Sequence, residues 1–109
     1  MDKRVWGKIK RGLKDGASLS MEKIEEYTKV GKLKIDELAA KRKIDRNFAD
    51  IGQVVFDLVE DGRGGDIEGN ATVKSAIESI KELRQEVVEI GGKVQQIQDD
   101  ARKVRAAPR

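Results

Sequence analysis

The chain has 109 residues, enough for one domain, and a net charge of +3, with charged residues making up 39% of it. It contains no cysteine and no histidine, which excludes disulfides, thiolate metal sites and acid–base catalysis by histidine. High charge with few aromatic residues favours long, solvated helices over a conventional globular core.

Residues 1–15 form a basic amphipathic segment, with six Lys or Arg against one Asp in residues 1–14. On a helix its apolar residues share one face and the basic residues occupy the remainder. That pattern suits an anionic membrane surface, the phosphates of a nucleic acid, or docking on a second subunit, and all three stay open. The candidate contact residues are Lys3, Arg4, Val5, Trp6, Lys8, Ile9, Lys10, Arg11, Leu13 and Lys14.

A long helix is expected over residues 18–61, with Ser18 or Ser20 as its N-cap. Two apolar stripes follow the 3–4 rhythm of a helix–helix seam. The first comprises Ile24, Thr28, Gly31, Ile35 and Leu38, and the second comprises Ile44, Phe48, Ile51, Val55 and Leu58. The step between them is one residue short of a heptad, which predicts a displaced seam with local over- or underwinding.

Within this helix, the stretch from Lys32 to Leu58 reads KLKIDELAAKRKIDRNFADIGQVVFDL. With its apolar, glycine and aromatic run from Ile51 to Phe56, it resembles a loosely defined group of small bacterial helical-hairpin (coiled-coil) proteins of unknown function. That resemblance implies a basic N-terminal helix, a long helix, a polar turn and a second, heptad-patterned helix. It implies no catalytic residues.

A turn is expected over residues 62–70, because four glycines in residues 61–70 are incompatible with a helix. Asp57, Asp61 and Glu68 have the spacing of ligands in a calcium loop. Val59, however, stands at a ligand position and offers no ligand oxygen. We therefore expect no metal here.

A second helix is expected over residues 71–105, with Asn70 or Thr72 as its N-cap. Its apolar residues alternate in steps of three and four, which predicts a single narrow seam. They are Val73, Ala76, Ile80, Leu83, Val87, Ile90, Val94, Ile97, Ala101 and Val104.

The expected fold is all-α, with residues 16–109 forming an antiparallel two-helix hairpin that assembles into a four-helix bundle. A turn centred near residue 66 would place Gly91 and Gly92 opposite Ala40 and Lys41. Close helix approach at the glycines and a flexible kink are both open. The same register leaves residues 1–27 without a partner in the chain.

We therefore predict a non-enzymatic, self-associating helical scaffold or adaptor, a dimer by preference, whose N-terminal segment docks on a partner protein or an anionic membrane surface. The alternative is a nucleic-acid-associated protein that contacts phosphates through its basic termini. Glu78, Glu82 and Glu86 recur every four residues, as on a solvated face. We expect no cofactor and no small-molecule substrate, and a cytoplasmic protein that associates peripherally with membranes.

Overall fold

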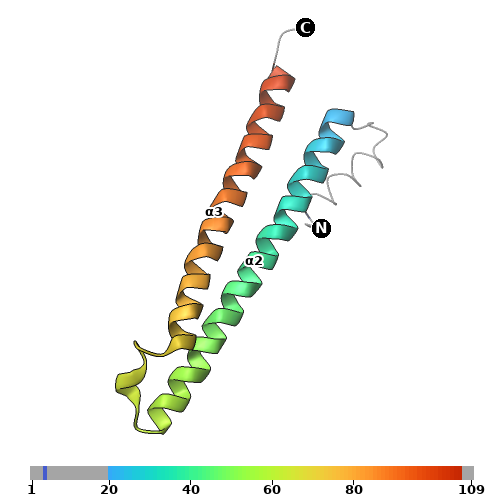
Figure 1. The fold of residues 1–109 in the computed structure, drawn as a ribbon. Helices are drawn as coiled ribbons and strands as arrows, with labels where there is room; N and C mark the ends of the chain where they lie inside the picture. Colours follow the sequence, from blue (N-terminus) through green and yellow to red (C-terminus); the bar gives the residue numbers. More distant parts are fainter. Residues whose placement is uncertain (1–3, 5–19, 107–109) are drawn as a thin grey trace. The chain divides into compact units, whose positions relative to one another are not determined.

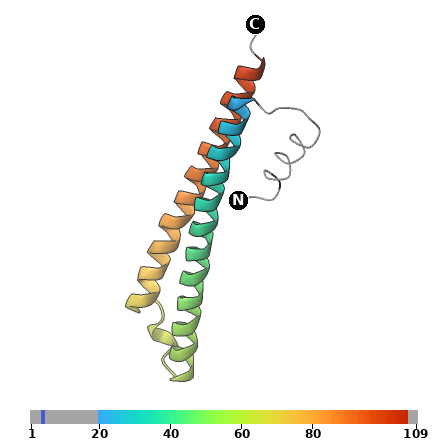
Figure 2. The same cartoon turned by 90° about the vertical axis from the view of Figure 1, so that its right-hand side faces the viewer.

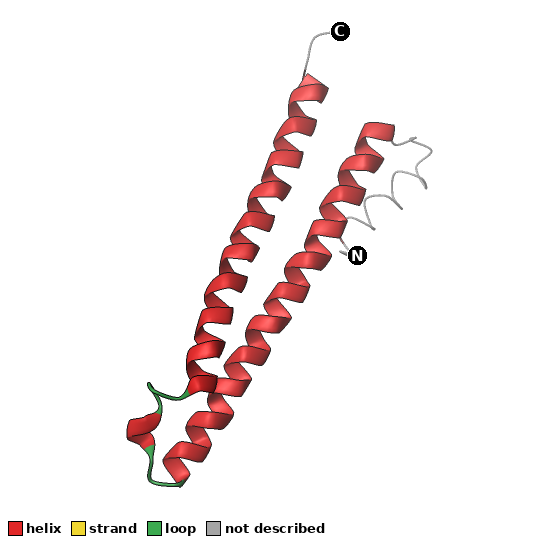
Figure 3. Ribbon diagram, viewed as in Figure 1, coloured by secondary structure: helices red, strands yellow, loops and turns green. Residues whose placement is uncertain are grey.

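The computed structural model describes Arg4 and residues 20–106. Helix α2 spans Met21–Glu60, the 3-10 helix η1 spans Gly64–Asp66, and helix α3 spans Ala71–Ala106. These described residues include no strand, and α2 and α3 pack against each other with a loop between them (Figures 1 and 3). The predicted all-helical hairpin is confirmed.

Side chains cap the start of each long helix. The Lys23 amide donates to Ser20 Oγ at 3.2 Å, so Ser20 is the N-cap of α2, and Ser18 lies outside the described residues. The amides of Thr72 and Val73 donate to Asn70 Oδ1 at 2.9 and 3.1 Å. Asn70 therefore caps α3, and Thr72 is inside the helix.

The end of α2 is set by Gly62, whose φ of 71° lies in the left-handed region. The amide of Gly62 donates to the carbonyl oxygen of Val59 at 3.1 Å, and the amide of Arg63 donates to that of Leu58 at 2.7 Å. This pair of bonds is a Schellman motif, in which a glycine avoids the strain that a Cβ would meet.

The chain divides into two compact units. Unit 1 joins the described residues up to Glu37 with those from Glu89 onward, and unit 2 is Leu38–Val88. Each unit pairs one segment of α2 with an antiparallel segment of α3, and only unit 2 contains the loop (Figure 2).

The core of unit 1 is a small apolar cluster. Val30, Ile90 and Val94 are buried, and Leu33 and Ile97 pack against them half-buried. Because Ile90 and Val94 meet Val30, α3 is displaced along α2 by about three helical turns from the expected register. The first turns of α2 therefore run beside the last turns of α3, and the predicted overhang does not extend to residue 27 (Figures 1 and 2).

Unit 2 shows why the register differs. Gly64 lies near the end of α2, since a Cβ there would be 4.0 Å from Val59 Cγ2. The loop thus folds back along α2 rather than leading straight into α3 (Figure 3). Asn47 Nδ2 then reaches Ser79 Oγ at 3.2 Å and joins the two helices. The buried apolar side chains of this unit are Ala40, Leu58, Val73, Ala76, Ile80 and Leu83.

The predicted seam of α3 lies where the helix is least exposed. The predicted seam residues between positions 73 and 101 are all buried or half-buried: Val73, Ala76, Ile80, Leu83, Val87, Ile90, Val94, Ile97 and Ala101. Val104, the last predicted member, is exposed instead.

The predicted seam of α2 needs correction. Phe48 is 47% exposed and the half-buried Asn47 stands in its place, while Ile44, Ile51, Val55 and Leu58 are half-buried or buried. One series of buried and half-buried residues follows an uninterrupted alternation of three and four: Val30, Leu33, Glu37, Ala40, Ile44, Asn47, Ile51, Val54 and Leu58. Gly31, Lys34 and Val55, each adjacent to a member of this series, are also buried or half-buried. The displaced seam was wrong, because the polar Glu37 and Asn47 occupy seam positions that an apolar pattern cannot reveal.

Gly91 and Gly92 are exposed within α3, which continues through them as a helix. A Cβ at either position would find no atom of the described residues within 4 Å. The proposed close approach at these glycines was therefore wrong.

Candidate functional site

The predicted contact segment lies almost wholly outside the described residues. Arg4 alone of its members is described, and it is helical with an exposed side chain. The other candidates, Lys3, Val5, Trp6, Lys8, Ile9, Lys10, Arg11, Leu13 and Lys14, lie outside the described residues. The candidate surfaces that the structure does describe are on α2 and α3.

An apolar stripe runs along α2 in unit 1. We call it the outer stripe, defined as Met21, Ile24, Thr28, Gly31 and Ile35. Met21 is 76% exposed, Ile24 42% and Ile35 54%. The sequence pattern grouped four of these residues, Ile24, Thr28, Gly31 and Ile35, with Leu38, and positions at this spacing share a face of a helix. It was wrong to place that face in the seam with α3, because Val30 and Leu33 pack there instead.

Gly31 departs from the rest of the outer stripe because it is buried. Gly52 occupies the matching position three heptads later in α2, is exposed, and has no described atom within 4 Å of a Cβ placed on it. Both glycines have a large apolar residue four positions ahead, Ile35 and Phe56 respectively.

Unit 2 exposes large apolar side chains of its own. Phe56 is 62% exposed, and Val59 follows it one turn later, also exposed, so the two share a face near the loop. We call this pair the loop patch. The unit's other exposed large apolar residues are Leu38, Phe48, Ile77 and Val88. Phe48 is partly covered, since the Arg84 guanidinium lies 5.7 Å from the centre of its ring.

Unit 2 also contains a shallow polar groove between its two helical segments. Its lining residues are Lys43, Arg46, Asn47, Asp50, Ser79, Glu82, Leu83 and Glu86. The three carboxylates stand beside two cations, and all five charged residues are exposed. Ser79 has no histidine to activate it, because the chain has none. The groove therefore offers hydrogen bonds and charge rather than a sequestered reaction site.

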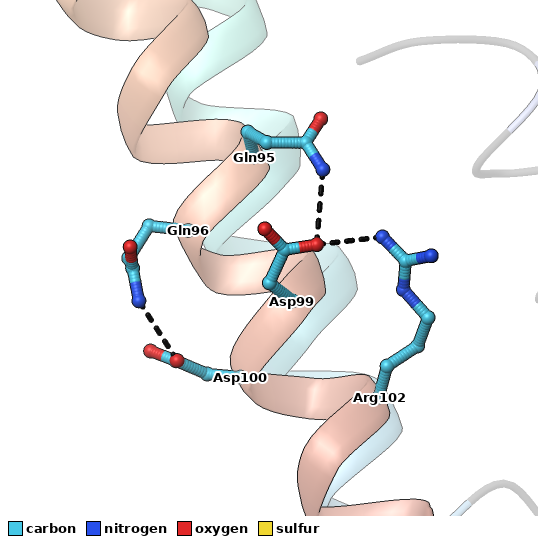
Figure 4. Close-up of polar contacts among 5 residues, drawn as sticks. All are labelled: Gln95, Gln96, Asp99, Asp100 and Arg102. Carbon is cyan, nitrogen blue, oxygen red and sulfur yellow. Dashed lines mark hydrogen bonds and ion pairs between the residues drawn. The ribbon is translucent and has the colours of Figure 1, made fainter.

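The C-terminal part of α3 carries polar contacts between residues of the same helix (Figure 4). Gln95 Nε2 donates to Asp99 Oδ1 at 3.0 Å, and the Arg102 guanidinium pairs with the same oxygen at 2.6 Å. Gln96 Nε2 donates to Asp100 Oδ1 at 2.8 Å. Solvent-accessible pairs of this kind contribute little stability.

In the part of the chain that the structure describes, no group of three or more acidic, cysteine or histidine side chains is placed to hold a metal ion. None of the described helices combines the length and apolar character that crossing a bilayer requires.

Comparison of the chain with models of protein families, with curated proteins and with solved structures finds no significant match.

Proposed function

We propose that the protein is a non-enzymatic helical scaffold of the cytoplasm that self-associates and docks through its basic N-terminal segment on an anionic membrane surface or a partner protein. One observation carries the proposal. Each long helix buries a single seam, and large apolar side chains remain exposed elsewhere on α2, including Met21 and Phe56. Exposed apolar stripes of this kind are typical of interaction surfaces.

The loop patch is the proposed self-association surface. A second copy could cover Phe56 and Val59 while leaving the inner seam of each hairpin intact. Two hairpins paired in this way would form a four-helix bundle with the seams of an antiparallel coiled coil. A dimer is the simplest closed arrangement for such a patch, since the same surface serves on both copies.

The N-terminal segment is the proposed docking element. It combines the chain's single tryptophan with a net charge of +5 over residues 1–14. Anionic headgroups attract such a segment by about 1 kcal/mol for each basic residue near the surface. Trp6, Ile9 and Leu13 would supply the apolar contact.

A binding role fits the polar groove better than catalysis does. The groove is open, its carboxylates are exposed, and the chain lacks histidine. Nucleic-acid binding through the termini is less well supported. Arg102 is paired with Asp99, and acidic side chains recur along the exposed faces of both helices.

Self-association is tested by light scattering of the purified full chain at micromolar concentration. We expect a dimer whose dissociation constant rises at least tenfold in Phe56→Glu, because the substitution places a charge in the proposed interface. Gln85→Glu is the matched control, since it adds the same charge to an exposed position of α3, away from the loop patch. A monomeric wild-type chain would overturn the proposal, and circular dichroism verifies that both variants keep their helices.

Docking is tested by flotation of the chain with vesicles of phosphatidylserine and phosphatidylcholine. We expect binding in the wild type that is lost in Trp6→Ala and weakened by salt. Binding to duplex DNA that falls steeply with salt and ignores Trp6→Ala would instead support the nucleic-acid alternative. If the chain binds neither vesicles nor DNA, docking on a partner protein is the reading that stays. If Trp6→Ala floats as well as the wild type, the proposed contact of Trp6 with the membrane is contradicted.

A further inference from the structure

A regular stripe of exposed residues on α2 connects the outer stripe to the loop patch. It starts at Ile35, the last residue of the outer stripe, and proceeds in steps of three and four to Phe56 and Val59. Because α2 is a single continuous helix over this range, the residues share one face. We call them the central stripe, and all of them are exposed: Ile35, Leu38, Arg42, Asp45, Ala49, Gly52, Phe56 and Val59.

The central stripe faces away from α3. At about 100° for each residue, its midline lies about 150° around α2 from the midline of the seam that contains Ala40 and Ile44. A Cβ placed on Gly52 would find no described atom within 4 Å. Another helix could therefore cover the central stripe without disturbing the seam.

Two opposite charges stand in the middle of the central stripe. Among the described residues, the side chains of Arg42 and Asp45 form no hydrogen bond and no ion pair. A helix that covered this face with apolar side chains alone would strip water from both charges without replacing it. The two residues therefore specify what can lie opposite them, an anion beside Arg42 and a cation beside Asp45.

A second copy of α2 that runs antiparallel supplies both partners. With a two-fold axis midway between positions 42 and 45, Arg42 of each copy lies opposite Asp45 of the other, and the two ion pairs are equivalent by symmetry. A parallel pair in register would instead set each charge against its own kind.

The apolar residues of the central stripe match in the same register. Leu38 of one copy lies opposite Ala49 of the other, and Ile35 lies opposite Gly52. A large side chain meets a small one in each of these layers, which allows two helices to pack closely. A shift by one heptad in either direction would set both charges of the stripe against uncharged residues.

We propose that two copies of the chain form a dimer in which the central stripes of their α2 helices pack antiparallel about this axis. Arg42 and Asp45 fix the direction and the register. Phe56 and Val59, the loop patch, continue the contact toward each end. This dimer rests on the self-association proposed above, and it adds the partner face and the residues that align it.

Charge reversal tests the ion pairs in the full-length chain by light scattering at micromolar concentration. Arg42→Asp and Asp45→Arg each gather four like charges around the axis, and each should raise the dimer dissociation constant at least tenfold. An equimolar mixture of the two variants restores opposite charges in every pair and should form a heterodimer about as tight as the wild-type dimer. Lys81→Asp and Glu89→Arg are the matched controls, since they make equivalent changes at exposed positions of α3 and should not weaken the dimer.

The outcomes distinguish this dimer from self-association in general. A monomeric wild type overturns both proposals. If the dimer is weakened by Phe56→Glu but by neither charge reversal, self-association stands and the antiparallel register fails. If both reversals weaken the dimer but their mixture stays monomeric, the pairing of Arg42 with Asp45 is wrong. Circular dichroism verifies that the variants keep their helices.

Two glycines test the close packing. Gly52→Leu should raise the dissociation constant at least tenfold, because the new side chain meets Ile35 of the second copy. Gly91→Leu is the matched control, since a Cβ at either glycine is unhindered within the described part of one chain and leucine favours a helix equally at both. Equal dissociation constants for the two variants would overturn the proposed packing.

Introduced cysteines test the direction of the pair. The chain has no cysteine, so Leu38→Cys and Ala49→Cys each introduce the only thiol. An oxidised mixture of the two variants should form a disulfide between unlike chains. Either variant alone should stay unlinked, because its two thiols lie about 16 Å apart along an antiparallel pair, beyond the reach of a disulfide. A disulfide formed by Leu38→Cys with itself would overturn the antiparallel arrangement.

Discussion

The two long helices differ in how many of their faces are apolar. Helix α3 has one apolar seam, and that seam is the face it buries. Helix α2 has two such faces. The inner face packs against α3 and contains the polar Glu37 and Asn47, whereas the outer stripe carries exposed large apolar side chains. Apolar periodicity therefore identifies the packed face only where a helix has a single candidate.

The difference has a physical origin in what each face contacts. The α3 seam packs against α2, and its members from Val73 to Ala101 are all apolar. On α2, the seam tolerates Asn47 because Ser79 accepts its hydrogen bond at 3.2 Å, and so its amide is not left unpaired. The large apolar side chains of the outer stripe and of the loop patch lie outside that seam and are exposed.

The largest expected effect is in the α3 seam. Ile90→Ala removes a buried side chain from the cluster with Val30 and Val94, and we expect a loss of about 2–5 kcal/mol of unfolding free energy. Val88→Ala, two residues away and 67% exposed, should change stability by less than about 0.5 kcal/mol. Urea unfolding followed by circular dichroism measures both. Similar losses would contradict the division of α3 into a packed and an open face.

The second effect separates the two faces of α2. Ala40 is only 2% exposed, and replacing it with leucine should cost about 1–3 kcal/mol, because the larger side chain overfills the seam. Ala39→Leu makes the same change at the adjacent, exposed position and should be close to neutral. The melting temperatures of the two variants, each compared with that of the wild type, measure the difference. If Ala40→Leu were neutral, the result would favour the seam expected from the sequence, in which Leu38 rather than Ala40 packs against α3.

The smallest effect concerns the polar seam position. Asn47→Leu replaces a half-buried amide with an apolar side chain of similar size, and we expect a gain of about 1 kcal/mol. Gln85→Leu adds the same side chain to an exposed site of α3 and should leave stability unchanged. Denaturant unfolding compares the two variants with the wild type. A large loss in Asn47→Leu would mean that its bond to Ser79 stabilises the hairpin more than apolar burial can.

Much of the fold could be predicted because its determinants are local. Gly62 ends α2 and Asn70 starts α3 through bonds to atoms a few residues away. The register could not be predicted, since it depends on how the loop folds back beside Val59. Most of the outer stripe was recognised from the sequence as residues that share a face, but that face was wrongly predicted to pack against α3. When one helix carries two apolar stripes, the pattern alone does not show which of them is packed.

By itself the sequence determined the helical class, the ends of the helices and the packed face of α3, because caps, glycines and a lone apolar seam act within a few residues of the chain. Only the tertiary structure decided which face of α2 packs and how far α3 slides along it. Those outcomes depend on residues distant in the chain, whose packing is settled jointly by both helices and the loop.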